Sequence, residues 1–194
     1  MGWGRRDYIL YYLSCQFLFN GYANFLNELK QDNLFAYSLN FAWTQFLLSL
    51  FFIKIYSHRY FTWILLAVTL VYQTNVLVAL QSSSIIATFD SSSFGLVSLL
   101  VTLYCLLYYA RQLSELPTEN ILTVRNFWYV NGLFTYYTSN FFIFLTYNTL
   151  TRTNAANISV IWRVHNVVFL IMCVYFFIGL RCKALPEEEL KLSL

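Results

Sequence analysis

A few polar side chains lie within stretches of sequence that are otherwise almost wholly apolar and aromatic. His165 is the only histidine predicted to lie inside such a stretch, and an imidazole can carry a proton or contact a ligand. Amides and tyrosines would complete a partly polar cavity, the kind that binds small molecules. The alternative is that these groups only hydrogen-bond between helices, for roughly 1 kcal/mol or less each. The candidate ligand-binding residues are Asn131, Tyr136, Asn140, His165, Asn166 and Gln45.

The residue types needed for catalysis or ion coupling are absent from the same stretches. No acidic residue lies deep in any of them, and ion-coupled transport commonly uses one. No HExxH motif, carboxylate pair or CxxC pair indicates a metal or acid–base site. The sequence therefore predicts no catalytic residue and no metal ligand, and it names no cofactor. An enzyme that uses Ser, Tyr and His is disfavoured but stays open.

The composition is that of a polytopic membrane protein. Of the 194 residues, 59% are hydrophobic and only 11% are charged, whereas a soluble domain carries about 25% charged residues. A soluble fold of this size could not cover so much apolar surface, so hydrocarbon must face most of the chain. The net charge of +3 is modest and the basic residues form no run, which disfavours nucleic-acid binding.

The apolar stretches predict an all-α transmembrane helical bundle with about six spans. Each stretch is roughly 20 residues long, which is the length that crosses a bilayer as a helix. We expect one transmembrane domain over residues 1–181 and a short cytoplasmic tail over residues 182–194. The expected spans are residues 8–26, 35–55, 60–80, 94–113, 127–150 and 158–180.

The basic residues divide unequally between the two ends of these spans. One side collects nine of them: Arg5, Arg6, Lys54, Arg59, Arg111, Arg125, Arg181, Lys183 and Lys191. The other side has three: Lys30, Arg152 and Arg163. By the positive-inside rule, both termini are cytoplasmic. Four tryptophans fall near span ends, where the headgroup layer favours amphipathic rings, and Trp43 is the exception.

The second half of the chain carries a more specific set of motifs. They are LPTENI at residues 116–121, FWYVNG at 127–132, YYTSN at 136–140, IW at 161–162 and HN at 165–166. Over residues 111–181 the chain resembles a family of small, largely uncharacterised polytopic inner-membrane proteins of Bacteroidota. The resemblance implies a multi-pass helical bundle in the inner (plasma) membrane with a sensory role, because such proteins can be encoded near two-component signalling genes.

The chain departs from that family's pattern in two places. Relatives usually have an additional N-terminal span, which is absent here. They often carry an acidic residue in the helix that matches residues 35–55, where this chain has Gln45. The second departure weakens any proton-linked role.

Four functions compete. The favoured one is a non-enzymatic, receptor-like module that binds a small molecule or lipid and acts through a partner protein. Its partners would be the lipid bilayer and a membrane signalling protein or other subunits, with no nucleic acid. A structural or assembly subunit of a larger membrane complex comes second and a transporter or channel third. A lipid-modifying enzyme ranks last.

Overall fold

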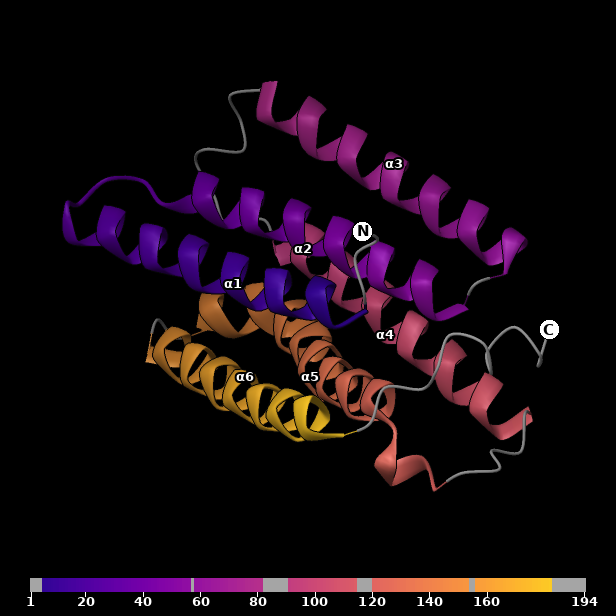
Figure 1. Ribbon diagram of the computed structural model, residues 1–194. Coiled ribbons are helices and arrows are strands. Elements are labelled where there is room, and N and C mark those ends of the chain that lie inside the picture. The colour runs from indigo at the N-terminus through magenta and orange to yellow at the C-terminus, as the bar shows by residue number, and fades with distance from the viewer. Residues whose placement is uncertain (1–4, 57, 82–90, 115–119, 154–155, 183–194) are drawn as a thin grey trace. The chain divides into compact units, whose positions relative to one another are not determined.

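The computed structural model describes residues 5–56, 58–81, 91–114, 120–153 and 156–182. Within these ranges the chain forms helices and no strand, which confirms the predicted all-α class (Figure 1). The elements are α1 (Arg5–Glu28), α2 (Leu34–Tyr56), α3 (Arg59–Gln81), α4 (Ser91–Ser114), the 3-10 turn η2 (Ile121–Thr123), α5 (Arg125–Thr153) and α6 (Ala156–Arg181).

In the part of the chain that the structure describes, four helices are long and apolar enough to cross a membrane. They are Phe35–Tyr56, Arg59–Val78, Ser93–Ser114 and Ser159–Arg181. These four helices agree with the predicted membrane protein. The six spans, the side on which the termini lie and the identity of the membrane remain predictions.

The other two helices are long enough to span but more polar. α1 has 24 residues and α5 has 29, and both carry several amides. The polarity of α5 has a structural reason, because α5 packs against both α4 and α6. Its Tyr129 ring packs edge-on against Phe176 of α6, its Asn140 amide contacts His165 of α6, and both side chains are at most 1% exposed. A helix enclosed in this way needs less apolar surface than one that faces lipid.

The chain folds into two compact units, Met1–Asp90 and Ser91–Leu194. We call them the N-terminal unit and the C-terminal unit and describe each by itself. The predicted single domain over residues 1–181 stays a prediction. Of the predicted tail, residues 183–194 lie outside the described part of the chain.

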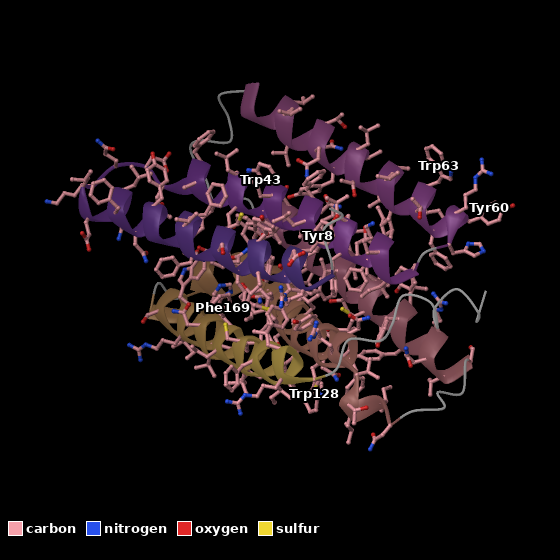
Figure 2. The ribbon with its side chains drawn as sticks, viewed as in Figure 1. Tyr8, Trp43, Tyr60, Trp63, Trp128 and Phe169 are labelled. Atoms are coloured by element: carbon pink, nitrogen blue, oxygen red, sulfur yellow. The ribbon has the colours of Figure 1, made fainter. Side chains whose placement is uncertain are left out.

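In the N-terminal unit, α2 lies between α1 and α3 (Figure 1). Its Leu48, Phe51 and Phe52 side chains are at most 1% exposed. α3 packs on α2 and leaves most of its own surface uncovered. Tyr60 and Trp63 lie exposed in its first turns, as expected for aromatic rings at a headgroup layer (Figure 2).

In the C-terminal unit, two glycines allow α5 and α6 to approach closely. A Cβ added to Gly132 of α5 would lie 2.9 Å from Phe176 Cε1, and one added to Gly179 of α6 would lie 2.7 Å from Tyr129 Cε1. The aromatic rings of each helix therefore occupy the space over a glycine of the other. Small residues serve this purpose in membrane helix packing, where backbones approach without a hydrophobic driving force.

Candidate functional site

Three of the six predicted ligand residues meet between α5 and α6. His165 Nδ1 of α6 lies 2.6 Å from Asn140 Oδ1 of α5, and His165 Nε2 lies 3.3 Å from the Tyr136 hydroxyl. Asn140 Nδ2 donates to the Tyr136 backbone oxygen over 2.8 Å. Tyr136 and Asn140 are buried, and His165 is partly buried. Positions 136 and 140 are one helical turn apart, so both side chains face the same point of α6.

The directions of these hydrogen bonds determine which imidazole nitrogen carries the proton. Because Asn140 Nδ2 is used as a donor to a carbonyl, Asn140 Oδ1 must be the atom that faces His165 and must accept. His165 Nδ1–H therefore donates to it, and Nε2 is left to accept from the Tyr136 hydroxyl. One neutral tautomer satisfies the whole cluster.

Aromatic rings surround the imidazole. The Trp162 and Tyr136 rings lie edge-on to it, with centroids 5.3 Å and 5.5 Å away, and the Phe144 ring lies 6.3 Å away. Phe169 in turn packs on Tyr136 at 5.7 Å. The cluster is thus a hydrogen-bonded polar centre inside an aromatic shell, and its ligand-binding role stays a prediction.

The other three predicted residues lie elsewhere. Asn131 accepts a hydrogen bond of 2.7 Å from the Tyr109 hydroxyl, which links α4 to α5. Asn166 lies on an exposed part of α6 beside Val167, which is 56% exposed. Gln45 belongs to the N-terminal unit. The structure therefore brings together Tyr136, Asn140 and His165, and leaves the other three outside that cluster.

Gln45 is the centre of a second polar network, between α2 and α3. Its Nε2 donates to Ser49 Oγ over 3.1 Å and to Thr69 Oγ1 over 3.3 Å. Its Oε1 accepts from Gln73 Nε2 over 3.4 Å. Gln45 is fully buried, so this network fixes the orientation of its amide.

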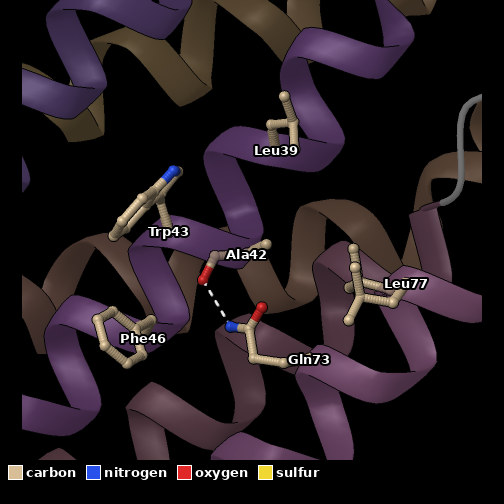
Figure 3. A pocket seen from close by; sticks show the side chains of 7 residues that line it. Leu39, Ala42, Trp43, Phe46, Gln73 and Leu77 are labelled. Atoms are coloured by element: carbon tan, nitrogen blue, oxygen red, sulfur yellow. Dashed lines mark hydrogen bonds between the residues drawn. The ribbon is translucent and has the colours of Figure 1, made fainter. Parts of the chain in front are cut away.

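Gln73 also lines a groove in the same unit, which we call the α2–α3 groove. The groove has a volume of about 300 Å³, and apart from the Gln73 amide and the Trp43 indole N–H its lining is apolar (Figure 3). Gln73 Nε2 donates to the Ala42 backbone oxygen over 2.8 Å, which holds the amide against α2. The lining residues are Leu39, Ala42, Trp43, Phe46, Gln73, Val76 and Leu77.

Sequence reasoning did not predict this groove. Trp43, deep within its span, was a signal for it, because an indole away from the headgroup layer needs another reason to be there. The lining residues of α2 share one face of that helix, because they lie three or four positions apart, at 39, 42, 43 and 46. The lining residues of α3, at 73, 76 and 77, share one face of α3 for the same reason. The pairing of these two faces depends on the helix register, which the sequence does not show.

Comparison of the chain with protein-family models, curated proteins and solved structures finds no match. The resemblance to the Bacteroidota family therefore rests on the sequence motifs alone. Among the described residues, no group of three His, Cys, Asp or Glu side chains lies close enough together to hold a metal ion.

Proposed function

We propose that the protein is a non-enzymatic, receptor-like module of the inner membrane, which binds a small apolar or amphipathic molecule and acts through a partner protein. The observation that carries this proposal is the α2–α3 groove. Its volume of about 300 Å³ lies at the lower end of the range for ligand pockets. A mostly apolar lining with one amide and one indole is the composition that such pockets commonly have.

The proposal includes six spans with both termini in the cytoplasm. Lys54 at the end of α2 and Arg59 at the start of α3 place two positive charges at one connection, as the positive-inside rule requires of a cytoplasmic loop. The six long helices of the described part of the chain support the same number of spans. The sensory role follows the resemblance to the Bacteroidota family.

Action through a partner is supported by the exposed apolar faces of the helices. On α6, Val160, Val167 and Val174 are each more than half exposed, and they recur every seven residues along one side. Such a face fits either lipid or a helix of another protein. A receptor without its own catalytic site needs such a contact to transmit binding.

Native mass spectrometry of protein extracted gently with its own lipid tests the proposal. We expect a small molecule and a partner protein to remain bound. If neither is retained under conditions that keep the protein folded, the proposal is wrong.

A structural subunit of a larger complex is the second candidate, and one observation favours it. Large apolar side chains on α3 are widely exposed, among them Trp63, Ile64 and Leu70 at 58% or more. In a complex these side chains would pack on neighbouring subunits. A monomer that stays folded in detergent without any other subunit would contradict this candidate.

A further inference from the structure

The amide of Gln73 is held in one orientation, and this orientation decides what the α2–α3 groove can bind. Gln73 Nε2 faces two acceptors, the Ala42 backbone oxygen at 2.8 Å and Gln45 Oε1 at 3.4 Å. Neither partner can offer a donor to Gln73 instead. The Ala42 partner is a carbonyl oxygen, and Gln45 Nε2 already donates to Ser49 and Thr69. The amide of Gln73 therefore cannot flip without losing these bonds.

The other half of that amide is open to a ligand. No described residue donates a hydrogen bond to Gln73 Oε1, which belongs to a side chain that lines the groove (Figure 3). In hydrocarbon, an acceptor without a donor is unfavourable by an amount comparable to a lost hydrogen bond. A molecule in the groove that offers an O–H or N–H donor would satisfy it.

The charge of the lining restricts that donor to a neutral group. The groove is lined by aliphatic and aromatic side chains, among them the Trp43 indole with its N–H, and by one amide, with no carboxylate and no basic residue among them. An ammonium ion or a carboxylate would be buried there without a counter-ion, and a carboxylate would bring only acceptors to Gln73 Oε1. A hydroxyl group supplies the missing donor without a charge.

The position of the groove along the helices fits a chain that enters from one leaflet. Gln73 lies eight residues before Gln81, the last residue of α3, so its amide is about 12 Å inside that end of the helix. From Leu39 to Phe46 the groove follows α2 for seven residues, or about 10 Å. Trp43, Phe46 and Leu77 are each more than a third exposed, so the groove opens toward the surrounding hydrocarbon.

We propose that the α2–α3 groove binds a neutral single-chain lipid alcohol, with its hydroxyl donating to Gln73 Oε1 and its chain lying along Trp43 and Phe46. The inference rests on the proposed function, since it names the class of molecule that the module binds. Gln45 is a positioning residue in this site, because it orients Gln73 and does not line the groove.

Photolabelling of the full chain in lipid nanodiscs tests the inference. The probes are a long-chain primary alcohol, the matching alkane and the matching carboxylic acid, each with one diazirine in the chain. We expect the alcohol to label peptides covering residues 39–46 and 73–77 more strongly than the other two, and unlabelled alcohol to compete. Equal labelling of these peptides by all three probes would overturn the inference, and this comparison needs no variant.

Gln73→Met tests the hydrogen bond with little change in volume. We expect it to raise the concentration of unlabelled alcohol needed for competition about five-fold, which corresponds to one hydrogen bond of about 1 kcal/mol. Labelling of the groove by the alkane probe should not change. Asn75→Leu is the matched control, because Asn75 is an exposed amide on the same helix that donates to its own Val71 backbone oxygen over 2.7 Å. An effect of Asn75→Leu equal to that of Gln73→Met would overturn the inference.

The two proposals fail in different ways. If native mass spectrometry retains a small molecule but the alcohol labels other peptides, the assignment to the groove is wrong while the binding function stands. If no small molecule is retained and no probe labels the groove, both are wrong.

Discussion

His165 and Asn140 join α6 to α5 through a hydrogen bond of 2.6 Å between the imidazole Nδ1 and the amide Oδ1. The amide sets the proton position, because its nitrogen is already committed to the Tyr136 backbone oxygen. The Tyr136 hydroxyl then completes the arrangement at Nε2. Each of the three residues thus depends on the other two for its hydrogen-bond partners.

Asn140→Leu should destabilise the protein by about 1–3 kcal/mol, because it leaves the His165 Nδ1–H without an acceptor in a partly buried site. The free energy of unfolding can be measured by tryptophan fluorescence during titration of mixed micelles with a denaturing detergent. The triple variant Asn140→Leu with His165→Phe and Tyr136→Phe should recover part of the loss, because all three polar side chains of the cluster are then replaced by apolar groups. If Asn140→Leu alone is as stable as the natural chain, the bond is not structural.

The same triple variant separates packing from ligand binding. If the cluster only holds α5 to α6, the triple variant should regain stability and keep any bound small molecule. If Asn140 and His165 contact a ligand, it should regain stability but lose that molecule in native mass spectrometry. The second result would confirm the predicted site of Asn140, Tyr136 and His165.

Gly132→Ala and Gly179→Ala should each destabilise the protein by about 1–3 kcal/mol, because the new methyl group meets a ring of the facing helix. The two losses should be similar, because each added Cβ also meets an atom that a ring rotation cannot move: Tyr175 Cβ at 3.1 Å for Gly132 and the Arg125 backbone oxygen at 3.2 Å for Gly179. Gly21→Ala is the matched control, with nothing within 4 Å of the added atom. Equal stability of all three variants would show that α5 and α6 do not pack this closely.

These glycines show where the sequence is informative and where it is not. Runs of about 20 apolar residues predict the helices, because only a helix satisfies its backbone groups in hydrocarbon. Gly21 and Gly132 look alike in the sequence, yet only Gly132 faces a ring of another helix. Helix periodicity shows which residues share a face, but it does not show which face of another helix lies opposite. For the same reason Gln45 could not be matched with Thr69 and Gln73 in advance.

Gln16→Leu should destabilise the N-terminal unit by about 1–2 kcal/mol. Gln16 of α1 is 5% exposed, donates to Thr44 Oγ1 over 2.6 Å and accepts from Asn40 Nδ2 over 3.1 Å, so its loss leaves two buried groups of α2 without partners. Asn24→Leu is the control, because Asn24 lies on an exposed part of the same helix. The unfolding measurement described for Asn140→Leu applies here. A loss for Asn24→Leu as large as that for Gln16→Leu would contradict the role of the α1–α2 hydrogen bonds.

The topology prediction depends on α1 and α5, the two long helices that do not meet the apolarity of a candidate span. Each can be tested by single cysteines near its two ends, in a background without the four natural cysteines. Gln31→Cys and Ser159→Cys should react with a membrane-impermeant maleimide in intact spheroplasts. Arg6→Cys and Asn120→Cys should react only after permeabilisation, because the positive-inside rule places these ends in the cytoplasm.

A helix that does not cross would give the same result at both of its ends. If Asn120→Cys and Ser159→Cys are both protected, α5 lies within the protein or along the membrane, and the number of spans is odd if α1 crosses. In the same way, equal reactivity of Arg6→Cys and Gln31→Cys toward the impermeant maleimide would show that α1 does not cross the membrane. α5 should cross despite its amides, because Asn131 and Asn140 bond to Tyr109 and His165 of the neighbouring helices, which shields these groups from lipid.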